Sequence, residues 1–405
     1  MGKIWIKISE VLFFQEGPGV RNTQYTTEGV KLLNVANLVN GKVDLSTSDR
    51  YISKEEAYGK YKHFLCDVGD FIVASSGIKV EYIDKKMGFI DESMLPLCMN
   101  TSTIRFKVLN ENQLRIRYFM YYLKSQHFKR QLAREITGSA QLNYGPSHLK
   151  KMVMPLVDVC IQDKIIRQMD KIQNIIDMRQ QELDYLDTLI KARFVEMFGD
   201  PVANDIGWDT LPLENVCKTI VDCPHSTPSY TNEDTGFMCI RTSIVKKNKI
   251  LWDDIEYISE EEFAKRIQRK KPEVGDIVYT REGAILGIAA IIDRDCNVAL
   301  GQRSMLLSPD IDKCTSEFLC VAMNSDSFLD NALKGVSGSA SPHINVGDIK
   351  AFRMITPPVE LQNQFSDFVN QVNKSKVVYQ IIINKLTFLQ KICYNNYKEQ
   401  YHIPG

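Results

Sequence analysis

Polar side chains beside glycine and proline turns are the residues of this chain best suited to chemistry. Four such clusters lie in the second half: Asp222 to Pro228, Arg241 to Ser243, Thr280 to Gly283 and Gly301 to Ser304. Arginine pairs with guanine, and glutamine with adenine, through two hydrogen bonds in the major groove of DNA. Loop-borne Arg, Gln and His side chains could therefore read base edges as a set, although any one of them could instead cap a turn or form a surface ion pair.

Patterns for catalysis and cofactor binding are absent from the sequence. It has no GxxxxGK[ST] phosphate loop, no GxGxxG fingerprint and no HExxH motif, and neither its 6 His nor its 10 Cys have zinc-ligand spacing. The Asn-Pro-Pro-aromatic motif of amino-methylating enzymes is also missing. We therefore expect no catalytic residue, no metal ligand and no cofactor on this chain, and cysteines that stay reduced.

The loops belong to a unit that occurs twice. The stretches DVGDFIVASSG and EVGDIVYTREG place Gly69 and Gly275 206 positions apart (275−69), whereas Gln162 and Gln362 are 200 positions apart (362−162). One six-residue deletion accounts for the change. Since solenoid repeats run roughly 20 to 50 residues, each copy should be a whole domain with an appendage.

The two copies share framework residues and differ at the loops. Thr280-Arg281-Glu282 corresponds to Ala74-Ser75-Ser76, and Asp222 to Pro228 corresponds to the unlike stretch Gly17 to Thr23. Two domains that share a scaffold but differ at polar loop tips should bind two different targets of one kind.

Each copy ends in a long helical pattern. Residues 161–198 would form a helix of about 57 Å, and prolines at 155, 357 and 358 precede the two helices. Apolar residues follow a heptad pattern, which favours a partner helix over a helix that only covers its own domain. The heptad positions are Ile165, Met169, Ile172, Ile176, Leu183 and Leu186 in the first helix and Phe365, Val369, Val372, Tyr379, Ile383 and Leu386 in the second.

These patterns predict an α+β protein with two duplicated domains, each with a strand-rich core, joined by two long helices packed as an antiparallel coiled coil. The predicted boundaries are 1–155 and 201–357 for the domains and 156–200 and 358–405 for the helical regions. Within the domains we expect strands at 71–74, 277–280 and 284–292 and amphipathic helices at 115–132 and 317–333.

Charge and hydropathy narrow the function further. The formal net charge is +0, which argues against a wholly basic surface that binds any polyanion. Lys265 to Lys271, KRIQRKK, forms the densest basic cluster, with a smaller set between Arg115 and Arg134, and both favour phosphate contacts. No stretch approaches the roughly 20 apolar residues of a membrane helix, so we expect a soluble, cytoplasmic protein.

In order and duplication these motifs resemble the specificity subunit of type I restriction-modification systems. The most specific local match is ARFVEMFGDP, Ala192 to Pro201, running into Gly207 and Trp208. The Val274-Gly275-Asp276 turn, DCPHSTP, Gly301-Gln302 and the Gly-Ser stretch before Ile349 are also similar to the family. The resemblance covers almost the whole chain.

The resemblance implies a non-catalytic DNA-binding subunit that reads a bipartite target, one half per target-recognition domain. The helices would set the spacer and dock two DNA adenine methyltransferase subunits, and through them the restriction and translocase subunits. S-adenosylmethionine, ATP and Mg would then be bound by those partners. An orphan or free-standing recognition subunit and a coiled-coil protein adaptor that does not bind DNA remain as alternatives.

Candidate base-reading residues follow from the loops of each copy. In the first domain the candidates are Arg21, Asn34, Ser75, Ser76, Lys79 and Asn100, and in the second they are His225, Arg241, Arg281, Gln302 and Arg303. The first domain has no Arg or Gln matching Arg281 and Gln302.

Overall fold

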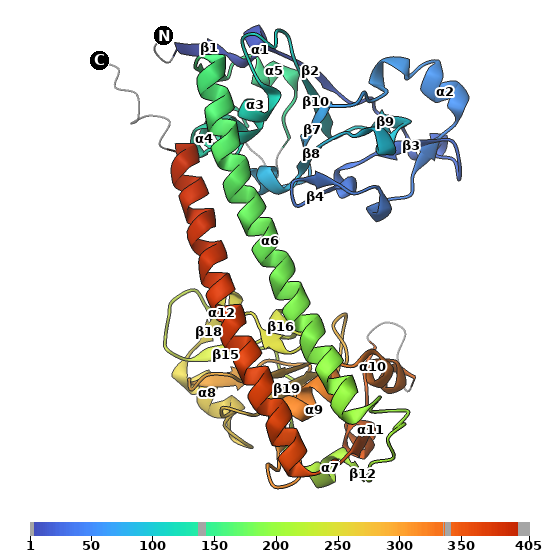
Figure 1. Cartoon of the computed structure of the whole chain (residues 1–405), viewed down its shortest axis with the longest axis vertical. Helices are drawn as coiled ribbons and strands as arrows, with labels where there is room; N and C mark the ends of the chain where they lie inside the picture. Colours follow the sequence, from blue (N-terminus) through green and yellow to red (C-terminus); the bar gives the residue numbers. More distant parts are fainter. Residues whose placement is uncertain (1–3, 137–142, 335, 337–341, 396–405) are drawn as a thin grey trace. The chain divides into compact units, whose positions relative to one another are not determined.

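The computed structural model describes residues 4–136, 143–334, 336 and 342–395 (Figure 1). The chain divides into two compact units: unit 1 is Met1–Met178 with Ile382–Gly405, and unit 2 is Arg179–Ile381. The repeated Gly-Ser-Ala triplets at 138–140 and 338–340 lie outside the described residues. The mixed helix and strand content of the two units confirms the predicted fold class.

Unit 1 is built on a four-stranded antiparallel sheet of order β2-β10-β7-β8 and a three-stranded sheet of order β6-β3-β9. Its strands are β1 (Ile4–Lys7), β2 (Leu12–Glu16), β3 (Val30–Leu33), β4 (Leu38–Val39), β5 (Lys42–Val43), β6 (Tyr51–Ile52), β7 (Phe71–Ala74), β8 (Met87–Phe89), β9 (Leu97–Met99), β10 (Thr103–Val108) and β11 (Val153–Leu156). Its short helices are α1 (Ile8–Val11), α2 (Lys54–Tyr58), α3 (Ile116–Leu123), α4 (Gln126–Glu135) and α5 (Pro146–Leu149).

Unit 2 repeats this plan with sheets of order β13-β22-β19-β20 and β14-β18-β15-β21. Its strands are β12 (Thr210–Pro212), β13 (Cys217–Asp222), β14 (Tyr230–Thr231), β15 (Met238–Ile240), β16 (Val245–Lys246), β17 (Lys249–Ile250), β18 (Glu256–Ile258), β19 (Ile277–Thr280), β20 (Ala289–Ile291), β21 (Val298–Leu300), β22 (Ser304–Pro309) and β23 (Arg353–Ile355). Its short helices are α7 (Leu213–Val216), α8 (Glu260–Arg266), α9 (Ser316–Met323), α10 (Asp326–Leu333) and α11 (Val346–Ala351).

Strand register corrects the prediction of a single six-residue deletion. Phe71 pairs with Phe89 in unit 1 and Ile277 pairs with Ile291 in unit 2, so the shift has already fallen to 202 (291−89) at β8 and β20. Thr103 and Ser304 occupy equivalent places in β10 and β22, a shift of 201 (304−103). The difference therefore accumulates in steps, and the largest step lies in the loop between β7 and β8.

Local chemistry explains two other departures from prediction. The helices expected at 115–132 and 317–333 are each split in two, because Ser125 and Ser325 accept hydrogen bonds from Phe128 N (3.2 Å) and Phe328 N (3.3 Å) and so begin a second helix. The strand expected at 284–292 is reduced to β20, because Gly287 has φ +76° and turns the chain before it.

Each unit has a large apolar core between one sheet and the helices that follow it. The sheet is β2-β10-β7-β8 in unit 1 and β13-β22-β19-β20 in unit 2. In unit 1, Phe106 of β10 lies 5.0 Å from Phe119 of α3, ring centre to ring centre. In unit 2, Phe318 of α9 lies 5.4 Å from Phe194 and 4.8 Å from Phe198, both near the end of a long helix. The end of this helix is thus part of the core of unit 2.

Two long helices contribute to both units. They are α6 (Val159–Phe198) and α12 (Val359–Asn395), as the heptad pattern predicted (Figure 1). Within unit 2, Asp187 Oδ1 lies 2.5 Å from Lys376 Nζ, and the guanidinium of Arg179 lies 5.3 Å from the ring centre of Tyr379. Residue numbers rise along α6 as they fall along α12, so the two helices run antiparallel there.

A buried glutamine joins each long helix to the domain before it. The Gln162 side chain accepts from Arg115 N (2.9 Å) and donates to the carbonyls of Gln113 and Val157 (2.8 Å each). Gln362 repeats this pattern with Thr315 N (2.9 Å), Lys313 O (3.0 Å) and Pro357 O (2.8 Å). Both side chains are 0% exposed, so the same joint attaches both helices.

Candidate nucleic-acid interface

The candidate residues gather where strands of the two sheets in each unit end. In unit 1, Ser75 follows β7 and its N–H donates to Ser102 O (2.8 Å), in the turn between β9 and β10. In unit 2, Arg281 follows β19 and its N–H donates to Arg303 O (3.1 Å), in the turn between β21 and β22. Ser102 and Arg303 share a positive φ, 69° and 74°. Ser75 and Arg281 are therefore structural equivalents.

A second pair of equivalent positions follows β3 and β15. Asn100 N donates to Leu33 O (3.1 Å) in unit 1, and Gly301 N donates to Ile240 O (2.8 Å) in unit 2. The next residues along the chain are Asn34 and Arg241. The sequence comparison did not align these two, yet the hydrogen-bond pattern places both at the same point of the scaffold.

In unit 2, Asp222 connects two of the predicted residues. Arg281 Nε and Nη2 donate to Asp222 Oδ1 (2.9 Å) and Oδ2 (3.2 Å), and His225 Nε2 lies 3.0 Å from Asp222 Oδ2. The Arg281 side chain is 7% exposed and that of His225 is 67% exposed. The Asp222 carboxylate thus links the buried Arg281 side chain to the exposed His225 side chain.

The other three candidates of unit 2 reach the surface. Arg241 pairs with Glu256 (2.8 Å), and its guanidinium lies 5.6 Å from the ring centre of Tyr230. Desolvation by burial raises the pKa of the Tyr230 hydroxyl, which stays protonated at neutral pH. Gln302 Oε1 accepts from Thr227 Oγ1 (3.1 Å), and Arg303 is about half exposed.

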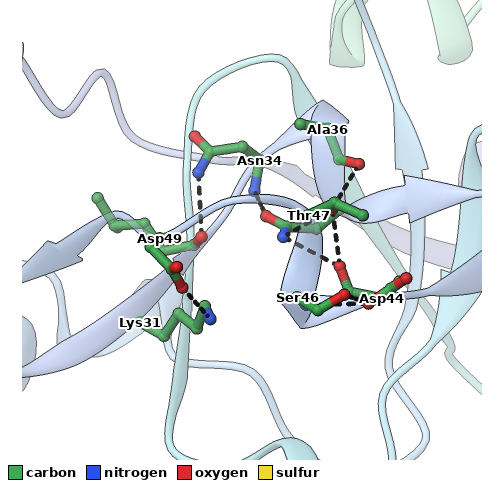
Figure 2. A network of polar contacts seen from close by, with 9 residues as sticks. Lys31, Asn34, Ala36, Asp44, Ser46, Thr47 and Asp49 are labelled. Atoms are coloured by element: carbon green, nitrogen blue, oxygen red, sulfur yellow. Dashed lines mark hydrogen bonds and ion pairs between the residues drawn. The ribbon is translucent and has the colours of Figure 1, made fainter. Parts of the chain in front are cut away.

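In unit 1 neutral side chains occupy the positions of the three arginines of unit 2, and Asn100 occupies the position of Gly301. Asn100 Nδ2 donates to Asn34 Oδ1 (2.8 Å), so these two candidates form one contact. Asn34 lies beside a turn in which Asn37 Nδ2 donates to Asp44 O (3.1 Å) and Thr47 Oγ1 donates to Ala36 O (2.9 Å). Figure 2 labels Asn34, Ala36, Asp44 and Thr47 of this network. Asn34 N donates to Asn37 Oδ1 (2.9 Å), which ties the candidate to this turn.

The remaining candidates of unit 1 differ in accessibility. Arg21 and Lys79 are exposed and Ser76 is half-buried. Lys79 lines a surface hollow together with Ile78, Tyr82 and other residues of the loop between β7 and β8. This loop is the one that is longer in unit 1, and it is absent in this form from unit 2.

Burial corrects the role of three candidates. Ser75 is 0% exposed, Asn100 1% and Arg281 6%, so their side chains do not present hydrogen-bonding groups at the surface. Among the described residues the Ser75 hydroxyl has no hydrogen-bond partner. We therefore treat these three as residues that shape the loops, and the exposed or half-buried candidates as those able to touch a ligand.

The basic cluster predicted to contact phosphate is largely engaged within the protein. Lys265 pairs with Glu261 (2.7 Å), and Lys270 pairs with Glu273 (2.8 Å) and Asp276 (3.0 Å). Arg266 and Arg269 reach back to the loop after β13. Sequence reasoning missed the contacts of these two arginines because Ser226 lies 40 residues from Arg266 and Asp222 lies 47 residues from Arg269, and no local pattern marks them.

Within the residues that the structure describes, no group of three or more His, Cys, Asp or Glu side chains could hold a metal ion. Nor does any helix of that part combine the length and apolar character that crossing a membrane requires.

The family of the chain follows from its match to known sequences. A family model described as "Type I restriction modification DNA specificity domain" matches twice, at residues 8–187 and 206–387. The chain belongs to this family. The two matches correspond to the two copies of the repeat, and they confirm the resemblance found in the sequence.

Individual relatives agree with membership in the type I specificity family. The chain is 23% identical over 186 residues to the type I restriction enzyme MjaVIII specificity subunit of Methanocaldococcus jannaschii, a match that spans 45% of this chain and 42% of that protein. Specificity subunits are the non-catalytic members of type I systems, and membership gives the chain a role in DNA recognition.

One solved structure shows a similar fold, and a second is reported beside it. One, titled as the structural basis of complex assembly and conformational transition of the type I R-M system, has a TM-score of 0.50 at 16% identity and covers 97% of this chain and 98% of its own. A type I restriction-modification S subunit from M. genitalium has a TM-score of 0.47 at 14% identity and covers 100% and 97%.

Proposed function

We propose that the chain reads a bipartite DNA target, with one recognition domain for each half. One observation carries this proposal: equivalent positions of a shared scaffold bear different polar groups, Asn34 against Arg241 and Ser102 against Arg303. Base-edge readout depends on such donors and acceptors. A scaffold kept constant with altered loop tips is suited to two targets of one chemical class.

The residues proposed to meet DNA are those whose side chains reach the surface. In the second domain they are His225, Arg241, Gln302 and Arg303, and in the first they are Arg21, Asn34, Ser76 and Lys79. Arg241 and Arg303 have the fork of donors that suits guanine, and Gln302 has the amide that suits adenine. Asn34 and Ser76 are half-buried and would contact DNA through small shifts of their loops.

The long helices are proposed to set the unread spacer and to dock two DNA adenine methyltransferase subunits. α6 has 40 residues, about 60 Å at 1.5 Å per residue, against about 34 to 36 Å for one DNA turn. All the predicted heptad positions, from Ile165 to Leu186 and from Phe365 to Leu386, are buried or half-buried. Packing as a coiled coil would keep this length constant.

Apolar side chains outside the heptad positions support the docking part of the proposal. On α6, Met178 is 53% and Tyr185 71% exposed, and on α12, Val377 is 59% and Phe388 63% exposed. Aromatic and Met side chains are enriched in protein interfaces. The proposed domain boundaries, 1–155, 156–200, 201–357 and 358–405, follow the same division of labour between recognition and docking.

The cofactors are proposed to reside on those partners. S-adenosylmethionine would be bound by the methyltransferases, and ATP and Mg by restriction and translocase subunits recruited through them. The chain itself would contribute target choice and geometry only.

Methylation mapping tests the proposal. The chain would be expressed with its methyltransferase in a host that lacks adenine methylation, and methylated adenines would be located by single-molecule sequencing. We expect one bipartite motif with a fixed gap, and His225→Ala with Arg241→Ala should relax only one half of it. A motif without two halves would refute the bipartite reading.

A binding assay separates the alternatives. An orphan subunit would bind the target DNA but would fail to co-purify with two methyltransferase copies. A protein adaptor would retard no DNA at physiological salt even with its partners present, and that result would remove the DNA-reading function altogether.

A further inference from the structure

Three arginine side chains converge on the loop that follows β13 in unit 2. Arg281 Nε and Nη2 donate to the Asp222 carboxylate (2.9 and 3.2 Å), and Arg269 Nη1 donates to the Asp222 carbonyl (3.1 Å). Arg266 Nη2 donates to the carbonyl of Ser226 (2.8 Å). The loop is therefore bonded at both ends, and most of these bonds go to its backbone or to its first side chain.

Burial makes this arrangement a fixed one. The Arg266 side chain is 1% exposed and also donates to Glu262 Oε1 (2.7 Å), while that of Arg281 is 7% exposed. Charge-assisted bonds from a planar guanidinium are strong and directional. Both side chains are buried and bonded inside the protein, so Arg266 and Arg281 cannot also bind bases or phosphates without leaving the loop.

The loop carries the groups that the proposed function assigns to DNA. His225 lies between the two bonded ends and is 67% exposed. The next residue but one, Thr227, donates to Gln302 Oε1 (3.1 Å), so the loop also contacts a second candidate reader. Holding the loop in advance removes an ordering cost that binding would otherwise have to meet.

The first domain holds its equivalent loop differently. Glu16 pairs with Ile104 as Asp222 pairs with Met305, but Ser75 stands where unit 2 has Arg281. There the loop is held by Gln24, whose Nε2 donates to Glu56 Oε1 (2.7 Å) and to the Tyr61 hydroxyl (3.0 Å). The arginine arrangement is thus a property of the second domain.

We propose that Arg266, Arg269 and Arg281 form an arginine clamp that fixes the loop of residues 222–227 for reading one half of the target. They are positioning residues and make no base contact, and the clamp determines the sequence preference of the second domain alone. The inference rests on the proposed function, since it needs the loop to meet DNA.

The test uses the full chain in its methyltransferase complex with the variants Arg266→Ala, Arg281→Ala and Arg281→Lys. Arg294→Ala serves as the control, since the Arg294 side chain is about half exposed, pairs with its neighbour Asp293 (3.2 Å) and lies over the Trp252 ring (4.5 Å). Two readouts are compared: the motif of methylated adenines, and amide hydrogen exchange of peptides covering 222–228 and 17–24.

We expect both alanine variants to speed exchange in 222–228 by about tenfold or more, the order of one lost charge-assisted bond. The base preference in one half-site should weaken by a similar factor, while the other half-site and exchange in 17–24 stay unchanged. Arg281→Lys should lie between wild type and Arg281→Ala, and Arg294→Ala should match the wild type.

Three results would overturn the clamp. Altered preference with unchanged exchange would show that the arginines touch DNA themselves, and faster exchange with unchanged preference would show that the loop does not read it. Equal loss in both half-sites with faster exchange throughout would show a merely structural role. If the wild type has no bipartite motif, the proposed function fails, and the exchange of 222–228 alone still decides whether the arginines hold the loop.

Discussion

Replacing Phe194 by Ala should loosen the attachment of the long helices to the second domain. The Phe194 ring is 2% exposed and its centre lies 5.2 Å from that of Phe198, 5.4 Å from Phe318 and 5.5 Å from Phe365. It therefore links α6 to both α9 and α12 within unit 2. Phe198, the last residue of α6, extends the same ring cluster, since its ring centre lies 4.8 Å from that of Phe318 and 5.5 Å from that of Phe365.

The magnitude follows from the buried surface. A buried Phe removes about 150 to 250 Å² from water, worth about 4 to 6 kcal/mol at about 25 cal/mol per Å². Measured Phe→Ala changes in protein cores cost about 3 to 5 kcal/mol. We expect a loss of about 4 kcal/mol in the free energy of unfolding of unit 2.

Native-state hydrogen exchange can measure this loss unit by unit, without assuming that the whole chain unfolds in one step. In Phe194→Ala, core amides of β19 and α9 should exchange almost a thousandfold faster at about 1.4 kcal/mol per tenfold, while those of β7 and α3 change little. Val195→Ala is the matched control, since Val195 is 57% exposed and should change stability by no more than about 0.5 kcal/mol. A loss below about 1 kcal/mol for Phe194→Ala would refute the role given to the ring cluster.

Three further outcomes are expected. Gln24→Ala should speed exchange of the first domain's loop and weaken preference in the half-site that the clamp variants leave unchanged; an effect on both half-sites would contradict independent reading. Ile383→Glu should place a charge at a position only 8% exposed and so lower the yield of the methyltransferase complex, and Ile172→Glu should lower that yield too. The DNA preference of each assembled complex should stay unchanged. Full yield for both variants would count against the helix pair as the docking site. Thiol alkylation of the native chain at pH 8 should modify the exposed Cys160 first, because burial raises the pKa of the Cys239 thiol to about 12 and keeps it protonated. Rapid loss of both thiols would show that the second domain opens easily.

The sequence was sufficient where structure depends on neighbours along the chain. The heptad pattern located α6 and α12, and the Gly-Asp turns located β7 and β19, because periodicity and turn chemistry are local. It failed where a local pattern continued through a break, as at Ser125 and Ser325, whose hydroxyl groups begin a new helix inside an amphipathic stretch.

Burial of a candidate could not be predicted in this way. Arg281 and Asp222 are 59 residues apart, and they meet only because β13 and β19 both pair with β22. A loop arginine beside glycine looks the same in sequence whether it faces solvent or an internal carboxylate. Its role is set by strand order, which no short motif of this chain encodes.

The buried glutamines at 162 and 362 have a consequence for how such a chain can change over generations. Each forms the same three hydrogen bonds, to the same backbone positions, at the point where a recognition domain passes into its helix. A genetic exchange with breakpoints beside these glutamines would replace one domain by a foreign one and still recreate a joint that already fits. Under the proposed function, such an exchange would produce a new target by recombination of halves, without any step in which the helix attachment has to be rebuilt.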